Sequence, residues 1–127
     1  MDYRNTIRSI LLKWDRPFEE VEKGKFMVSL SERRVLSIGF IKNSIGLRVM
    51  EPEVYKYSDR RKTMIFGRKA ASAHNVRYDQ SEKQPAFILY IVPENSDEEE
   101  LSKAMDECKT DLEAAMDDFN RHMFRTA

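Results

Sequence analysis

The first regular pattern in the chain has the spacing of an amphipathic α-helix. Its apolar residues recur at intervals that place them on one helical face: Ile7, Ile10, Leu11 and Trp14. Pro17 ends the pattern, because proline lacks an N–H group and restricts the residue before it. We therefore predict an N-terminal helix whose apolar face packs on a core. The alternative is that this face anchors another protein or a membrane surface.

The next pattern has a period of two, which is typical of half-buried β-strands. Apolar residues alternate with polar or small ones in three segments, 26–30, 36–40 and 45–49, which short polar links separate. This alternation predicts an antiparallel meander with one face toward the core and the other toward water. Pro52 closes the meander.

The middle of the chain has a weaker pattern. Residues 54–57 and 63–66 have the composition of two short strands around a polar turn, and the alanines of segment 67–75 favour a short helix. The polar segment 77–85 is typical of a mobile loop or an exposed hairpin tip. Residues 87–92 are continuously apolar, with β-branched and aromatic side chains, which indicates a strand buried on both faces.

The last part of the chain predicts a long helix. Its apolar residues repeat about every 3.67 positions, which differs from the 3.5 of a left-handed coiled coil and favours a helix lying on a sheet. They are Leu101, Met105, Cys108, Leu112, Met116, Phe119 and Met123. Ser96 with Glu99 predicts a capping box at the helix start.

These elements together predict an α+β fold in a single domain, residues 1–127. We expect an antiparallel β-sheet, made of the meander and the buried strand 87–92, packed against an N-terminal helix and a long C-terminal helix.

The charges are divided along the chain, although the formal net charge is zero. Residues 94–127 carry eleven acidic and four basic residues, whereas residues 1–93 carry eleven acidic and eighteen basic ones. Opposed regions of this kind indicate electrostatic contact with partners. The basic region could equally neutralise the acidic helix within the same molecule.

The densest basic segment is also interleaved with aromatic residues. The candidate binding residues there are Tyr55, Tyr57, Arg60, Arg61, Lys62, Arg68 and Lys69. A site that binds single-stranded nucleic acid needs cations that contact the phosphates and flat rings that stack on the bases. The same cations also suit an acidic protein surface, or serve only to keep strand edges from aggregating.

No motif for catalysis, metal binding or cofactor binding is present. The two histidines, His74 and His122, lie far apart in sequence, and no C-x-x-C, P-loop, G-x-S-x-G or G-x-G-x-x-G pattern occurs. Cys108 falls on the apolar stripe of the last helix among acidic neighbours, so we expect a buried, unreactive thiol. We therefore predict a protein that is not an enzyme, with no catalytic residues, no metal site and no cofactor.

The compartment is predicted from the same composition. The longest apolar run, residues 86–93, is far shorter than a membrane span. A single cysteine fits a reducing compartment. We expect a cytoplasmic protein.

The order of the expected elements resembles that of the YbjN and type III secretion chaperone-like group. The matching stretches are residues 7–14, 26–30, 70–78, 87–93 and 97–101. Proteins of this group have an opening helix, a three-stranded meander, a middle helix, further strands and a long final helix. The resemblance implies a non-enzymatic, protein-binding module that is often a dimer.

Three hypotheses for the function follow. The leading one is a small chaperone-like or regulatory adaptor that engages a partner protein through the basic segment 56–69 and its amphipathic terminal helices, as a homodimer. The first alternative is a single-stranded nucleic-acid-binding protein that uses segment 55–69. The second is an immunity-type or anti-defence inhibitor that uses the acidic C-terminal helix.

Overall fold

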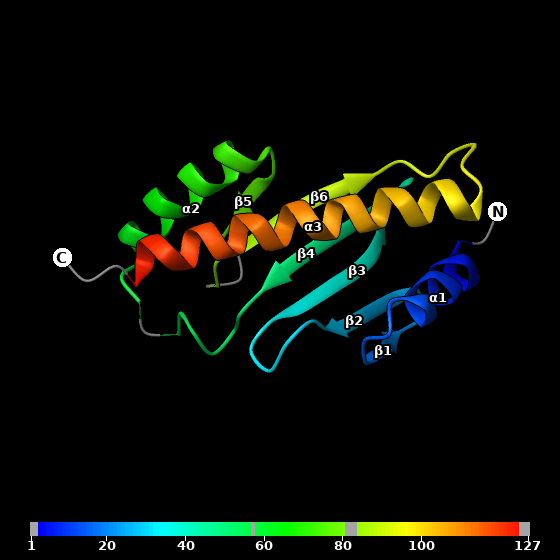
Figure 1. The fold of residues 1–127 in the computed structure, drawn as a ribbon, viewed down its shortest axis with the longest axis horizontal. Helices are drawn as coiled ribbons and strands as arrows, with labels where there is room; N and C mark the ends of the chain where they lie inside the picture. Colours follow the sequence, from blue (N-terminus) through cyan, green and yellow to red (C-terminus); the bar gives the residue numbers. More distant parts are fainter. Residues whose placement is uncertain (1–2, 57, 81–83, 125–127) are drawn as a thin grey trace.

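The computed structural model describes residues 3–56, 58–80 and 84–124. In these ranges three helices and a six-stranded antiparallel sheet form an α+β fold, which confirms the predicted class (Figure 1). In chain order the elements are α1 (Arg4–Lys13), β1 (Phe18–Glu22), β2 (Lys25–Ser29), β3 (Val35–Ile41), β4 (Ser44–Met50), α2 (Arg60–His74), β5 (Arg77–Asp79), β6 (Ala86–Ile91) and α3 (Glu98–Met123). None of these helices is long and apolar enough to cross a bilayer, within the described ranges.

The sheet has the strand order β1-β2-β3-β4-β6-β5, with every neighbouring pair antiparallel. The predicted meander is confirmed as β2, β3 and β4. Strand β6 lies between β4 and β5, so the predicted central position of segment 87–92 is also confirmed. Strand β1 was not predicted, because its sequence, FEEVE, carries three glutamates and only two apolar residues.

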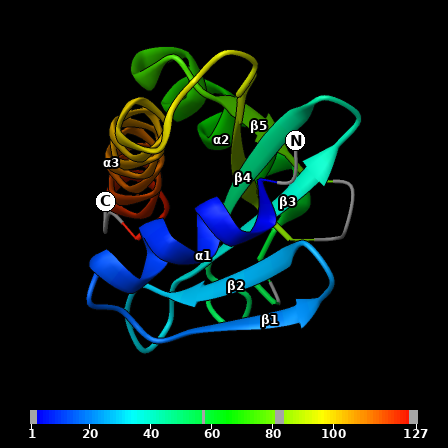
Figure 2. The same cartoon turned by 90° about the vertical axis from the view of Figure 1, so that its right-hand side faces the viewer.

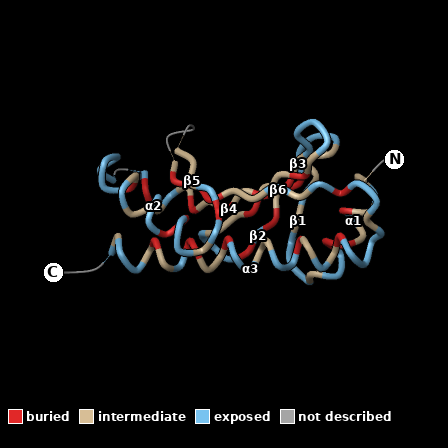
Figure 3. Tube along the Cα trace, turned by 90° about the horizontal axis from the view of Figure 1, so that it is seen from above, coloured by how far each residue is buried: buried red, intermediate tan, exposed pale blue. Residues whose placement is uncertain are grey.

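The core lies on one face of the sheet. Side chains of β2, β3 and β4 alternate between buried and half-exposed, so only one face of each strand is fully covered. All three helices contribute to the cluster on that face, as represented by Ile7 of α1, Ala70 of α2 and Leu112 of α3. Figure 2 shows α3 beside the strands on that face, and Figure 3 shows that the buried segments of α3 are those toward the strands. The predicted packing of α1 and α3 on the sheet is therefore confirmed.

The expected pair of short strands in the middle of the chain is wrong, because residues 60–74 form helix α2. The Asp59 side chain caps it by accepting hydrogen bonds from the N–H groups of Arg61, at 2.9 Å, and Lys62, at 3.4 Å. Asn75 ends the helix in the left-handed conformation, with φ 57°. The expected short helix 67–75 is thus the second half of a longer one.

Three smaller expectations also need correction. Segment 77–85 is not all loop, because β5 pairs with β6 there; residues 81–83 lie outside the described residues. Strand β6 is not buried on both faces, since the side chain of Tyr90 is 43% exposed. The N-cap of α3 is Asp97 rather than Ser96, and its Oδ1 accepts the Glu100 N–H at 2.8 Å. An aspartate at the N-cap provides a hydrogen-bond acceptor for a free N–H group of the first turn, so the capping box is not needed.

A buried polar network joins the loop before β3 to the end of β4 and to α3. The Arg34 guanidinium contacts three carboxylates: Glu51 at 2.8 Å, Glu113 at 3.1 Å and Asp117 at 2.6 Å. Glu51 also accepts a hydrogen bond from the Asn120 amide at 3.0 Å. The network therefore ties elements together that are 17 to 83 residues apart in sequence.

A second ionic contact fixes α1 to β1. Both Arg4 and Arg8 donate to the Glu20 carboxylate, which also accepts the Gly24 N–H at 2.9 Å. The hydrogen bond from Arg4, with that from Gly24, lowers the pKa of Glu20 from 4.5 to about 2.

This lowered pKa predicts a specific pH dependence of stability. Because the pKa is lowered in the folded chain, the contribution of Glu20 is complete above pH 4.5 and is lost as the pH falls toward 2. We expect the free energy of unfolding of Glu20→Gln to change less with pH in this window than that of the wild type. Urea unfolding at pH 2.5, 3.5, 4.5 and 7 measures how the free energy of unfolding changes with pH in the wild type and in the variant. Identical slopes would contradict this assignment.

Candidate functional site

The predicted cations of segment 60–69 lie on α2, and all five are exposed: Arg60, Arg61, Lys62, Arg68 and Lys69. Four residues of α2 share the side of the helix opposite its buried residues, because they are spaced four, three and one positions apart. They are Arg61, Ile65, Arg68 and Lys69. The side chain of Ile65 is 48% exposed at the centre of this group. We call these four residues the basic face.

The five arginines and lysines of α2 have no ionic partner among the described residues. Three acids of α3 have other partners: Glu113 and Asp117 contact Arg34, and Asp118 contacts His74 at the end of α2, at 3.1 Å. The suggestion that the basic region, residues 1–93, neutralises the acidic helix therefore holds in part, because Lys13 and Arg34 of that region contact acids of α3. Among the described residues, the five cations of segment 60–69 take no part in these contacts.

The first turn of α2 is electrostatically unfavourable. It carries Arg60, Arg61 and Lys62 and no acidic residue. The helix dipole favours negative charge at this end, and each misplaced cation costs about 0.3–1 kcal/mol. Positions where a sequence breaks a local rule without a structural gain are where functional demands are expected.

We therefore expect that reversing two of these charges stabilises the fold. In the variant Arg61→Glu/Lys62→Glu the free energy of unfolding should rise by about 0.5–2 kcal/mol, because both side chains then complement the dipole. Urea denaturation measures the change, with Arg68→Glu/Lys69→Glu beyond the first turn as the matched control, for which we expect no gain. A loss of stability in Arg61→Glu/Lys62→Glu would show that the cations serve the fold.

The two predicted tyrosines do not join the cations. Tyr55 is only 4% exposed, and its ring packs on Phe119 with 4.8 Å between centroids. Its hydroxyl donates to Asn120 Oδ1, so both ends of the side chain are engaged in the interior. Tyr57 lies outside the described residues. The half-buried Phe66 ring packs on His122, with 5.8 Å between ring centroids.

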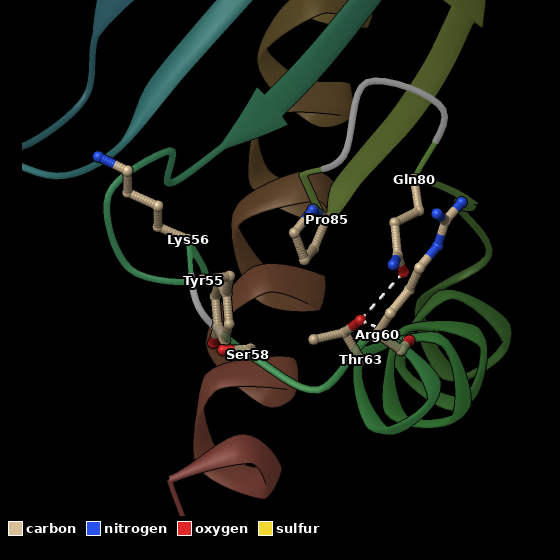
Figure 4. A pocket seen from close by; sticks show the side chains of 7 residues that line it. All are labelled: Tyr55, Lys56, Ser58, Arg60, Thr63, Gln80 and Pro85. Atoms are coloured by element: carbon tan, nitrogen blue, oxygen red, sulfur yellow. Dashed lines mark hydrogen bonds between the residues drawn. The ribbon is translucent and has the colours of Figure 1, made fainter.

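A cavity of about 230 Å³ lies between the start of α2 and the segment after β5 (Figure 4). It is lined by Tyr55, Lys56, Ser58, Arg60, Thr63, Gln80 and Pro85. Thr63 Oγ1 lies 2.8 Å from the Arg60 carbonyl and 3.0 Å from Gln80 Oε1, and Lys56 extends away from the other side chains. Thr63 and Gln80 are thus hydrogen-bonded to each other, and the Tyr55 hydroxyl is hydrogen-bonded to Asn120. Within the described ranges, no group of three His, Cys, Asp or Glu side chains is arranged to hold a metal ion.

Cys108 is half-buried on α3 and packs against the core. Burial, together with the negative charges of Asp111 and Glu107, raises the pKa of its thiol to about 11. Because the thiolate is the reactive species, we expect slow alkylation by iodoacetamide at pH 7.5, with the rate rising toward pH 11. Mass spectrometry of folded and urea-unfolded chain over this pH range measures the effect. Equal alkylation rates of the folded and the urea-unfolded chain at pH 7.5 would contradict the expected protection.

No protein-family model matches the chain, and no curated protein matches it in sequence. Comparison with solved structures finds the crystal structure of YbjN from E. coli, described as "a putative transcription regulator". The match has a TM-score of 0.61 at 14% sequence identity, and it covers 93% of this chain and 90% of that one. At this identity the match establishes the fold alone. The resemblance in element order is thus confirmed as a fold shared with YbjN over nearly the whole of both chains.

Proposed function

We propose that this chain is a non-enzymatic, protein-binding module of a regulatory or adaptor type, which engages an acidic partner protein through the basic face of α2. The observation that carries the proposal is the set of exposed cations on one helix that have no ionic partner among the described residues. The fold shared with YbjN is consistent with a regulatory role and does not identify a partner. The chaperone-like activity and the homodimer stay predictions.

The composition of the basic face favours a protein over a nucleic acid. Ile65, an exposed aliphatic side chain, lies between Arg61 and Arg68 along the helix. Protein interfaces commonly have an apolar centre with a polar rim and are enriched in arginine. An acidic surface or helix that presents an apolar side chain to Ile65 complements this arrangement.

The single-stranded nucleic-acid hypothesis uses the same cations but lacks a stacking ring on this face. Non-specific binding of single strands depends on aromatic side chains whose faces are open to bases. The Tyr55 ring is inside the fold, and one side of Phe66 contacts His122. The inhibitor hypothesis also stays a prediction, although several acids of α3 are already engaged by Arg34 and His74 within the chain.

Capture from the native lysate tests the proposal. Immobilised wild type is compared with Arg61→Glu/Arg68→Glu/Lys69→Glu, with and without nuclease, at about 50 and about 500 mM salt. The matched control reverses three exposed cations elsewhere, Arg33, Lys42 and Lys103. We expect the wild type and the control to retain the same discrete acidic proteins after nuclease treatment, and the α2 variant to lose them.

Two outcomes would contradict the proposal. Retention of the same proteins by the α2 variant would show that the basic face is not the contact. Capture that disappears with nuclease and falls steeply with salt would favour a nucleic acid; about five cations on phosphates give a log–log slope near −3.5 to −4.5.

A further inference from the structure

The face of the sheet opposite the helices carries a second candidate site. Side chains on this face are half-exposed or exposed, and no helix covers it in the part of the chain that the structure describes. A groove of about 420 Å³ crosses it, which is within the range of about 300–1,000 Å³ for ligand pockets. The groove runs over β2, β3, β4 and β6 and is separate from the basic face of α2.

The floor of the groove is made by two glycines directly opposite each other, Gly39 of β3 and Gly46 of β4. Tyr90, which pairs with Gly46 from β6, covers one of them: a Cβ atom at position 46 would lie 3.3 Å from its ring. A Cβ atom at position 39 would meet only Lys25 Cγ, at 4.0 Å. The Gly46 half of the floor is thus covered by an aromatic ring, and the Gly39 half is open.

Packing within the chain gives no reason for the glycine at position 39. A glycine inside a strand costs about 0.5–1 kcal/mol relative to alanine, because it loses more conformational freedom on folding and has no side chain to pack. A larger side chain would fit there at ordinary contact distance. Such a glycine marks a site that another group approaches closely.

The rim of the groove combines apolar and positively charged groups. The side chains of Tyr90 and Ile41 are 43% and 55% exposed. Lys23 and Lys25 form no ion pair with any described residue, whereas the third cation, Arg48, contacts Asp79 at 2.5 Å. Glu22 is the one acidic residue in the lining. The rim is therefore positive and complements carboxylates.

We propose that the groove receives an aromatic side chain of a partner polypeptide, and that flanking carboxylates of this polypeptide meet Lys23 and Lys25. The ring covers Gly39, as the Tyr90 ring covers Gly46, with the Lys25 ammonium within reach of its face. Two lysines beside Glu22 are too few to follow a phosphate backbone, so the groove favours a peptide over a nucleic acid.

The test is an NMR titration of the ¹⁵N-labelled full chain with the capped peptide Ac-Glu-Phe-Glu-NH₂. The controls are Ac-Glu-Ala-Glu-NH₂, Ac-Lys-Phe-Lys-NH₂ and a dT₁₀ oligonucleotide. We expect the amide signals of Gly39, Gly46 and Tyr90 to shift with Ac-Glu-Phe-Glu-NH₂ and to shift at least tenfold less with each control. Shifts of equal size with the alanine peptide, shifts elsewhere, no shifts, or stronger binding of the oligonucleotide would each overturn the proposal.

Two variants separate binding from folding. Gly39→Val fills the open half of the floor and should abolish the shifts, while Ser29→Val, on an exposed position of neighbouring β2, should retain them. The exposed substitution Lys25→Glu needs no repacking and should reverse the preference between the Glu-Phe-Glu and Lys-Phe-Lys peptides. An unchanged preference would overturn the proposal even if Gly39→Val failed to fold. Because the groove and α2 are tested with different variants, failure here leaves the proposed function of α2 intact.

Discussion

Replacing Arg34 with alanine is expected to lower the free energy of unfolding by about 3–5 kcal/mol, because it leaves a buried carboxylate without its cation. The side chains of Arg34 and Glu51 are only 11% and 7% exposed, and the guanidinium also contacts Glu113 and Asp117. Urea denaturation followed by circular dichroism measures the loss. The exposed neighbour Arg33 provides the matched control, since Arg33→Ala should change stability by less than about 0.5 kcal/mol.

A second substitution tests the physical reason for this loss. If the unpaired Glu51 charge causes it, then Glu51→Gln in the Arg34→Ala background should recover at least about 1 kcal/mol, because a neutral amide is less costly to bury. The amide can still accept the hydrogen bond from Asn120. A double variant as unstable as Arg34→Ala alone would show that other contacts of Arg34 dominate.

The second large effect is expected at Gly67, in the buried face of α2. Alanine is the better helix former by about 1 kcal/mol, so an isolated helix would gain from Gly67→Ala. In this fold, however, the new Cβ atom would lie 2.2 Å from Cε1 of Tyr78. The Tyr78 ring packs against Phe87 and Phe119 and cannot move freely. We expect a net loss of about 1–3 kcal/mol in the free energy of unfolding.

A double-mutant cycle with Tyr78→Ala measures the coupling directly. In that background the obstacle is absent, so Gly67→Ala should become neutral or stabilising. Ser72→Ala on the exposed side of the same helix is the matched control and should stabilise by a few tenths of a kcal/mol. Stabilisation of the wild type by Gly67→Ala would contradict the close packing of α2 on Tyr78.

The same contact helps to explain why the first half of α2 was not predicted from the sequence. The residues that α2 buries are small, Thr63, Gly67, Ala70 and Ala71, and at Gly67 the Tyr78 ring fills the space beside the helix. A pattern of small residues has no hydrophobic period, so the apolar residues of segment 63–66, Met64, Ile65 and Phe66, suggested a strand instead. By contrast, α1 and α3 bury large aliphatic and aromatic side chains at helical spacing, and the sequence predicted both.

The candidate site was also predictable only in part. A run of cations in a short segment is visible in any sequence, and the structure places these residues together on α2. Their role in binding stays a prediction. The Tyr55 hydroxyl is hydrogen-bonded to Asn120, which lies 65 residues away in sequence. No local sequence pattern reveals this contact. The glycine pair of the groove depends in the same way on strand register, which brings Gly39 opposite Gly46.

Site-specific photocrosslinking can show whether α2 is the surface that contacts a partner protein. A benzoylphenylalanine at Ile65, in the centre of the basic face, is compared in nuclease-treated native lysate with one at Leu12, which is 68% exposed on α1. We predict a discrete adduct with an acidic protein from position 65 but not from position 12, and its loss when Arg61, Arg68 and Lys69 are changed to glutamate. No adduct at position 65, or one that persists after the reversal, would contradict the assignment of α2 as the partner-binding surface.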